Sequence, residues 1–262
     1  MALPQLQPIH KFTVEHLEVK VFADRQSCGT AAGQHAAGLI RSAFNTQKNV
    51  SLVFGAAPSQ NEFFVALTQQ ENIEWPRITA FQMDEYYGIS PDDPRVLRNY
   101  MERHFYRYQR PGNTPFLDPI TDDPSAECRR YTELLKEYPL DISCVGIGES
   151  CHLAYNDPHV AKFDDDESVK LVEIDETSRL QQVHDGTVSR VEDAIMKAYT
   201  LTLPALMSAP HVSCVAPGSI KAAAVARTLT ESISESCPST ILRRHPNAVL
   251  FLDVDSASHL SL

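Results

Sequence analysis

The sequence of 262 residues has no apolar run that approaches the roughly 18 residues of a membrane-spanning helix. Its start, residues 1–4, lacks the basic stretch and apolar run of a secretory signal. Positive charge is scarce, because 23 lysines and arginines face 34 aspartates and glutamates, which gives a formal net charge of −11. Nonspecific nucleic-acid binding needs a basic surface. We therefore expect a cytoplasmic protein that binds neither nucleic acid nor a membrane.

The sequence also lacks the cysteine patterns of metal sites. Its six cysteines include no C-x-x-C pair, and no histidines cluster near them. They stand at Cys28, Cys128, Cys144, Cys151, Cys214 and Cys237. This spacing matches no zinc site, and a chain with a full hydrophobic core rarely needs a disulfide framework. We expect free, mostly buried thiols and no metal or other cofactor.

Apolar runs of strand length alternate with segments of helical spacing along the chain. The expected strands are residues 17–23, 50–54, 78–83, 141–147, 211–216 and 249–254, the last of which would close the sheet. The expected helices are residues 27–43, 59–69, 95–106, 126–137, 191–203 and 221–229. This alternation predicts a single α/β domain over residues 1–262, of the doubly wound type, a three-layer sandwich with a mostly parallel sheet.

Two short motifs place acid/base side chains at strand ends. The stretch CVGIGESCHLAYNDP, residues 144–158, is an apolar run with glycines, followed by His152 and, five positions later, Asp157. A histidine and a carboxylate at the carboxyl end of a strand are typical of acid/base chemistry in an α/β enzyme. The second motif, MDEY at residues 83–86, delivers Asp84 at the end of another expected strand.

These two motifs, in this order, resemble those of the glucosamine-6-phosphate deaminase (isomerase) family, which reads G-x-G-x-D-G-H-I-A-F-N-E-P and M-D-E-Y. The residues that match the first pattern are Gly146, Gly148, His152, Ala154, Asn156 and Pro158. The resemblance extends over residues 17–253 and includes the 6-phosphogluconolactonase superfamily. It implies that His152 opens the sugar ring and that Asp84 carries a proton between two carbons, without a metal.

Three residues depart from the family pattern beside the histidine. Ser150 replaces an aspartate, Cys151 replaces a glycine, and Asp157 replaces a glutamate. In the family the two carboxylates orient the histidine, so losing one should weaken catalysis. Glu149 could replace it only if the loop is rebuilt, and whether Ser150 is a repaired or a crippling change is open. The Cys151 thiol also permits a nucleophilic interpretation, although no third residue that would orient it is evident.

A phosphate site is expected where the strand at residues 50–54 meets the next helix. The family's G-x-x-T-G-[SG]-T-P corresponds here to GAAPSQNE, residues 55–62. The candidate phosphate ligands are Gly55, Ser59, Gln60, Asn61, Arg179 and Lys221. A helix start favours anions, but Glu62 adds a negative charge and forms a capping-box pattern with Ser59. An ordinary capped helix is therefore an equally open interpretation.

Two basic residues support the anion site by resemblance. Lys221 follows Pro217-Gly218-Ser219, as the lysine does in the family's G-x-x-K pattern. Arg179 lies in residues 157–190, where the family has a mobile lid with a phosphate-binding arginine, although His184 competes for that position. The acidic run at residues 164–167 fits a lid and a solvated surface loop equally well.

The resemblance implies an enzyme that converts an amino-sugar 6-phosphate to a ketose 6-phosphate and releases ammonia by an enediol route. Its catalytic residues would be Asp84, His152, Asp157 and Ser150. A 6-phosphogluconolactonase-like hydrolase is an alternative, although lactone hydrolysis needs no base such as Asp84. A non-catalytic sugar-phosphate sensor is another, supported by Ser150 and the altered phosphate loop. The expected partner is a small sugar phosphate, and a homo-oligomer is left open because the family includes monomers and hexamers.

Overall fold

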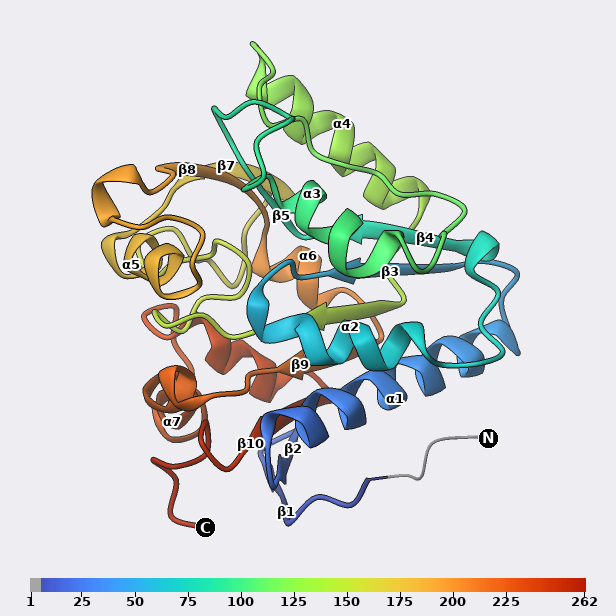
Figure 1. The fold of residues 1–262 in the computed structure, drawn as a ribbon, viewed down its shortest axis with the longest axis vertical. Coiled ribbons are helices and arrows are strands. Elements are labelled where there is room, and N and C mark those ends of the chain that lie inside the picture. The colour runs from blue at the N-terminus through green and yellow to red at the C-terminus, as the bar shows by residue number, and fades with distance from the viewer. Residues whose placement is uncertain (1–5) are drawn as a thin grey trace.

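The computed structural model describes residues 6–262, so the expectation drawn from residues 1–4 lies outside it. Over this range a seven-stranded sheet has the order β1-β2-β10-β9-β6-β3-β4, and a three-stranded sheet has the order β5-β8-β7 (Figure 1). The large sheet consists of β1 (His10–Val14), β2 (Leu17–Phe22), β10 (Ala248–Asp253), β9 (His211–Val215), β6 (Ile142–Val145), β3 (Val50–Phe54) and β4 (Ile78–Gln82). The small sheet consists of β5 (Asp84–Tyr86), β8 (Lys197–Leu201) and β7 (Val169–Glu173).

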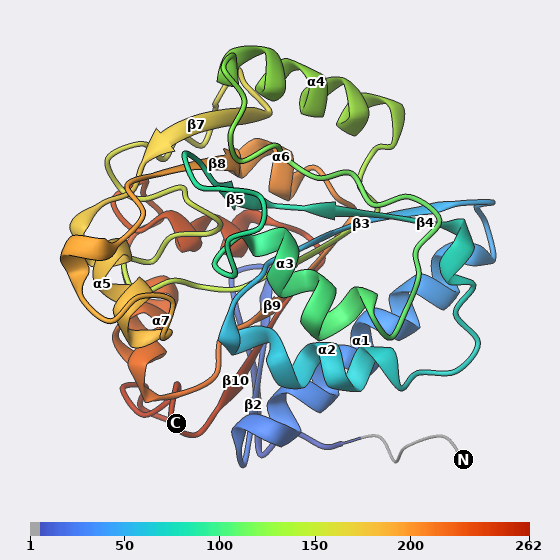
Figure 2. The same cartoon turned by 45° about the horizontal axis from the view of Figure 1, so that its top comes forward.

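The helices cover both faces of the large sheet. They are α1 (Arg25–Phe44), α2 (Asn61–Thr68), α3 (Leu97–Met101), α4 (Pro124–Glu137), α5 (Glu176–His184), α6 (Leu203–Met207) and α7 (Ala222–Thr230). Figure 2 shows α1 and α2 on one side of β3 and β4, and α4 and α6 on the other. Along β3, Leu52 and Phe54 belong to the core under α1 and α2, whereas Val53 belongs to the core on the opposite face. The predicted α/β three-layer sandwich is confirmed.

Neighbouring strands of the large sheet run parallel except β1 and β2, which are antiparallel. All residues of β3 and β6 are buried, which explains their continuous apolar runs. The last strand, β10, lies between β2 and β9, so the expectation that it closes the sheet is wrong. The edge beyond β2 is formed by β1, which the sequence patterns did not reveal.

The predicted helix at residues 191–203 is wrong. The structure has β8 there, paired antiparallel with both β5 and β7. Residues 198–201 are all buried. The sequence of β8, KAYTL, shows no two-residue alternation of buried and exposed positions, so the sequence could not separate a strand from a helix. Pairing with two strands decides for the strand. Residues 157–190, expected to be an irregular lid, contain β7 and α5.

Helices α1 and α2 approach each other so closely that glycine is required between them. A Cβ atom on Gly29 would lie 2.4 Å from the Glu62 Cβ, and one on Gly33 would lie 2.7 Å from the Ala66 Cβ. These contacts fix α2, and with it the loop that precedes it, against α1. The phosphate loop predicted from the sequence is therefore held by core packing.

Two expectations about the chain as a whole can be compared with the described residues. All six cysteines are free thiols, and Cys128 alone among them is not fully buried. This confirms the prediction of free, mostly buried thiols. Within residues 6–262, no helix has both the length and the apolar character needed to span a membrane.

Candidate active site

A cavity of about 410 Å³ lies at the carboxyl ends of the neighbouring strands β9, β6, β3 and β4. This edge is where open α/β sheets bind ligands. The predicted site residues that line the cavity are Gly55, Ser59, Gln60, Asp84, His152 and Lys221. They come from four separate stretches of sequence. Ser150, Asp157, Asn61 and Arg179 do not line it.

Asp84 enters the cavity where the chain passes from the large sheet to the small one. It follows β4 and opens β5, where it pairs with Thr200 of β8. Its side chain is buried, and Oδ1 has no hydrogen-bond partner among the described residues. Burial, with the charge of Glu85, raises the pKa of Asp84 to about 8. A carboxyl group in this state can hold a proton near neutral pH and exchange it with a bound ligand.

Glu85, the next residue of the MDEY motif, has a structural role. Its buried carboxylate accepts hydrogen bonds from the Gln82 side chain at 2.8 Å and from the backbone amides of Tyr86, Leu97 and Arg98 at 2.8, 2.8 and 2.9 Å. Burial raises the pKa of Glu85 to about 6. The two amides from residues 97 and 98 belong to the first turn of α3, so Glu85 fixes that helix to β5.

Replacing Glu85 with alanine should therefore destabilise the fold. Several buried donors lose their acceptor, and we expect a loss of about 3 kcal/mol or more in the free energy of unfolding. Urea denaturation measures it. Glu133→Ala is the matched control, because Glu133 is exposed on α4 and its pair with Lys136 should contribute no more than about 1 kcal/mol. Equal losses in the two variants would contradict a structural role for Glu85.

His152 is held by a tight loop after β6. The Gly148 amide donates to the His152 carbonyl at 2.9 Å, and the Cys151 amide donates to the Gly148 carbonyl at 3.0 Å. A Cβ atom on Gly148 would lie 1.9 Å from Nε2 of His152, so only glycine leaves room for the imidazole. The other ring nitrogen, Nδ1, contacts Asp157, which does not line the cavity, so Nε2 is the ring nitrogen on the cavity side.

Cys151 lies in the left-handed backbone region, with φ of 65°. The resembled family has glycine at this position, and glycine adopts that conformation without strain. The Cys151 thiol is fully buried and does not line the cavity. Its contact with the Cys237 thiol, together with burial, raises the pKa of Cys151. A thiol in this state is a poor nucleophile, so the nucleophilic interpretation is not supported.

Behind His152, four side chains meet around one oxygen atom. The Nδ1 atom of His152 is 3.0 Å from Asp157 Oδ1, and the Ser150 and Ser178 hydroxyls donate to the same oxygen at 2.8 and 2.5 Å. Each hydroxyl is also 2.8 Å from Nδ1. Burial alone would raise the pKa of Asp157, but hydrogen bonds and the charge of His152 lower it to about 2. Asp157 is therefore an anion that orients His152.

The missing second carboxylate is thus replaced by hydroxyl groups. Glu149 does not take its place, because its carboxylate faces His184, 3.0 Å from Nδ1. The hydroxyls of Ser150 and Ser178 together take the place of that carboxylate. The sequence did not point to Ser178. It lies in α5, and no motif marks it. The only signal was its place in the segment that the resemblance assigned to a lid.

Lys221 and the loop after β3 also line the cavity. Lys221 is buried in a short turn, Ser219–Lys221, and burial lowers its pKa. The side-chain amide of Gln60 donates to the Ser59 hydroxyl at 3.2 Å and to the Val215 carbonyl at 3.1 Å. A Cβ atom on Gly146 would lie 2.8 Å from that amide nitrogen, which explains a glycine there. A buried ammonium beside hydroxyl and amide groups is suited to an anion.

The expected capping box between Ser59 and Glu62 is wrong. Glu62 instead accepts a hydrogen bond from Arg25 Nε at 2.9 Å, and Arg25 also donates to the Pro58 carbonyl. The first residue of α1 therefore neutralises the charge that would have repelled a phosphate. Sequence reasoning missed Arg25 because the contact joins two helices that are distant along the chain.

Two predicted phosphate ligands, Asn61 and Arg179, do not line the cavity. Asn61 accepts a hydrogen bond from the Tyr100 hydroxyl and does not line the cavity. Arg179 lies on α5 with its NH1 atom 3.5 Å from the Met196 sulfur, outside the cavity. In both cases the preceding residue contacts the site instead. Gln60 lines the cavity, and Ser178 contacts His152 behind it.

Several further residues complete the cavity wall. The tyrosine rings of residues 86 and 155 lie 5.8 Å apart, and that of Tyr155 lies 6.0 Å from His152. Tyr155 stands where the family motif has phenylalanine, a departure that could have drawn attention to it. The rim also includes Arg95, Arg103 and His104, together with Gln181 and residues 185–187. The last group shows that the expected lid segment forms one wall of the cavity.

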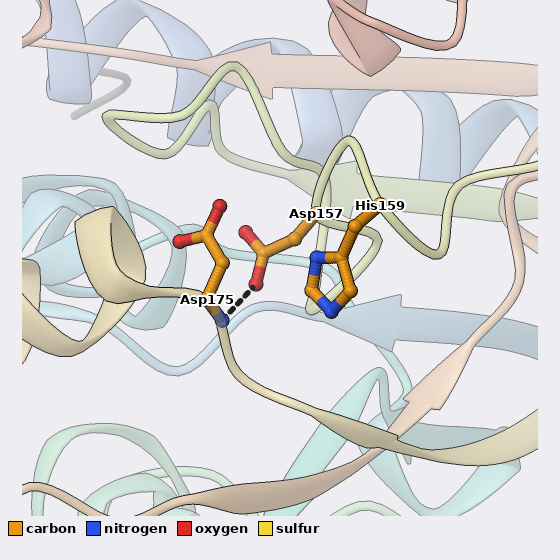
Figure 3. A group of neighbouring side chains, drawn as sticks. All are labelled: Asp157, His159 and Asp175. Atoms are coloured by element: carbon orange, nitrogen blue, oxygen red, sulfur yellow. Dashed lines mark hydrogen bonds between the residues drawn. The ribbon is translucent and has the colours of Figure 1, made fainter.

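One group of described side chains, shown in Figure 3, has the composition of a metal site. Ligand atoms of Asp157, His159 and Asp175 lie within 4.8 Å of one another. Both carboxylates already serve other groups, since Asp157 Oδ2 accepts from the Asp175 amide at 3.1 Å and Asp175 Oδ1 accepts from the Ser178 amide at 2.7 Å. The second bond caps α5, so both carboxylates are already engaged by groups of the protein.

The family described as glucosamine-6-phosphate isomerases/6-phosphogluconolactonase matches residues 23–251. The chain belongs to this family. A glucosamine-6-phosphate deaminase of Streptococcus sanguinis strain SK36 is 29% identical over 214 residues, which cover 81% of this chain and 87% of the relative. A glucosamine-6-phosphate deaminase of Listeria monocytogenes serotype 4a is 28% identical over 215 residues, covering 82% of this chain and 90% of the relative.

Solved structures of the family have the same fold. A monomeric glucosamine-6-phosphate deaminase superimposes with a TM-score of 0.84 at 26% identity, covering 92% of this chain and 99% of that one. The 6-phosphogluconolactonase of Thermotoga maritima superimposes with a TM-score of 0.74 at 16% identity, covering 90% and 99%. The family thus holds two kinds of enzyme on one scaffold, and the side chains of the cavity must decide between them.

Proposed function

We propose that this chain is a glucosamine-6-phosphate deaminase-like enzyme, which converts an amino-sugar 6-phosphate to a ketose 6-phosphate and ammonia. The observation that carries the proposal is the meeting of Asp84, His152 and Lys221 in one cavity of about 410 Å³. These residues supply a proton-transfer carboxyl group, a general acid/base and a buried cation. Lactone hydrolysis has no use for a carboxyl group that moves a proton between carbons, so the position of Asp84 favours the deaminase over the lactonase.

Each group has a defined step in this reaction. His152 moves a proton between the ring oxygen and the anomeric hydroxyl, which opens the sugar, while Asp157, Ser150 and Ser178 hold its ring. Asp84 then removes the proton from C2 and returns it to C1. Water adds to the resulting iminium carbon C2, and ammonia leaves to give the ketose. The protons balance without an oxidant or reductant, because the reaction is an internal redox transfer followed by hydrolysis.

The phosphate is held in this proposal by Lys221 with Ser59 and Gln60, and by the amide groups of the loop that begins at Gly55. Arg25 supports the loop by neutralising Glu62. Because this group is remote from C1 and C2, its binding energy is about the same in the ground and transition states. Such uniform binding lowers KM with little effect on kcat.

Replacing Lys221 with methionine should therefore raise KM for glucosamine 6-phosphate about 10- to 100-fold, the range expected for a charged hydrogen bond, with kcat changed only a few-fold. Steady-state ammonia release measures both constants. Lys136→Met is the matched control, because Lys136 is exposed on α4. An unchanged KM in Lys221→Met would place the phosphate elsewhere.

A further inference from the structure

A second cavity, of about 590 Å³, lies away from the active site and shares no lining residue with it. Its walls come from α1, from β1, β2 and β10, and from residues 6–8. Residues 6–22, which contribute two of these strands, precede the part of the chain that the family match covers. The cavity is therefore built in part from a segment that precedes the family match.

Positive charge gathers around this cavity. Lys11 and Lys20 are direct partners across β1 and β2, and Arg41 reaches it from α1. Among its described lining residues there is no carboxylate. Glu18 lies just outside, 3.4 Å from the Lys11 ammonium and 2.8 Å from that of Lys20. Three cations with one carboxylate leave an excess of positive charge on a chain whose formal net charge is −11.

Aromatic side chains form part of the cavity wall, beside polar ones that include Gln7 and Gln70. Phe251 pairs with Lys20 across β10 and β2, and the Lys20 ammonium lies 5.5 Å from its ring centre. The His35 ring lies 5.3 Å from the same ring, and Phe22 stacks on it at 6.2 Å. The Nδ1 atom of His35 is buried without a hydrogen-bond partner among the described residues. Burial lowers the pKa of His35 to about 4, so a neutral imidazole is available to pair with a polar ligand atom.

Gly38 lines the cavity on the exposed side of α1. A Cβ atom there would meet no other atom within 4 Å, so a larger side chain can be placed at this position. The volume falls in the range of small-molecule sites, about 300 to 1,000 Å³, and exceeds that of the active-site cavity. A wall that combines aromatic rings, cations and a neutral polar group is complementary to an anion with an aromatic body.

We infer that this second cavity binds a small aromatic anion of the size and charge of a nucleoside monophosphate, at a site separate from the active site. The phosphate pairs with Lys11, Lys20 and Arg41, and the aromatic body enters the space beside Gly38 and Leu39. This inference does not depend on the proposed deaminase activity.

The probe is adenosine 5′-monophosphate, and isothermal titration calorimetry on the full chain measures its binding. Gly38→Phe should fill the cavity, and Lys20→Met should remove a central charge while keeping the aliphatic stem. Each variant should weaken binding at least about tenfold, the usual effect of losing one charged contact. Circular dichroism checks that both variants are folded. Because phenylalanine is a better helix former than glycine, α1 should tolerate the change.

Two controls separate this site from the others. Lys221→Met, which alters the active site, and Lys136→Met, on the surface of α4, should bind the nucleotide as the wild type does. Adenosine and inorganic phosphate should each bind about tenfold or more weakly than the intact nucleotide, because each supplies half of the contacts.

Any of the following results would overturn the inference. If Lys221→Met abolished nucleotide binding, the nucleotide would bind in the active site instead. Binding that is absent in the wild type, or unchanged in Gly38→Phe, would show that the cavity takes no such anion. A change in the sedimentation of Gly38→Phe, without a change in nucleotide binding, would instead make this face a contact between copies of the chain.

Discussion

Replacing Asp84 with asparagine should abolish ammonia release and, at alkaline pH, make the folded chain more stable. The activity falls because asparagine cannot accept the C2 proton. Positioned general bases contribute about 10²- to 10⁴-fold to a rate, so we expect a loss of about 10³-fold or more in kcat. Asparagine has nearly the shape of a protonated aspartate, so substrate binding and the fold should persist.

The gain in stability follows from the raised pKa. In the unfolded chain Asp84 ionises near its ordinary value of 3.8, whereas burial in the folded chain holds its pKa at about 8. As the pH rises from about 4 to about 8, the unfolded state loses this proton first, so the wild type loses stability over that window. Asparagine has no such proton. The advantage of Asp84→Asn should grow through the window and then level off, at a few kcal/mol at most.

Urea denaturation of both proteins between pH 4 and pH 9 measures this difference. Asp193→Asn is a suitable control, because Asp193 is exposed on the surface and its removal should not change the pH dependence. A pH-independent difference between wild type and Asp84→Asn would contradict a buried carboxyl group with a raised pKa at position 84.

The second large effect is expected for Asp157→Asn. Asp157 Oδ1 accepts from two hydroxyls and contacts Nδ1 of His152, which leaves Nε2 toward the cavity. An asparagine amide can turn its NH₂ group toward Nδ1 and so stabilise the wrong tautomer. In a Ser-His-Asp triad the equivalent change lowers kcat about 10⁴-fold, and we expect about 10²- to 10⁴-fold here. The loss should appear in kcat, with KM little changed, because Lys221 is untouched.

Two smaller substitutions serve as controls for Asp157→Asn. Ser150→Ala and Ser178→Ala each remove one hydroxyl but leave the carboxylate against Nδ1, so each should cost only about tenfold, the equivalent of one hydrogen bond. Steady-state kinetics of the four proteins measure this ranking. If Asp157→Asn stayed within a few-fold of the wild type, Asp157 would not be the group that orients His152.

The parallel sheet was predictable because its strands are short, mostly apolar segments between helices. The strand β8 was not, because its sequence, KAYTL, has no alternating pattern and only its two partner strands show that it is a strand. The motifs pointed to Asp84 and His152, and both residues line the cavity. Their chemical roles remain predictions.

The supporting contacts could not be read from the sequence. The segment of α5 was expected to give an arginine to the site, but its neighbour Ser178 faces His152, because adjacent residues on a helix point about 100° apart. The spacing of Ser59 and Glu62 matched a capping box in the sequence, yet Glu62 accepts its hydrogen bond from Arg25 of another helix. Both errors concern side chains whose partners are distant in sequence.

The most direct test of the proposed function is the simultaneous measurement of ammonia and ketose 6-phosphate from glucosamine 6-phosphate, with purified wild type and His152→Ala. The account predicts equal amounts of both products from the wild type and almost none from His152→Ala. Hydrolysis of 6-phosphogluconolactone without ammonia release would contradict it in favour of the lactonase. Stabilisation by glucosamine 6-phosphate with no turnover would contradict it in favour of a sugar-phosphate sensor.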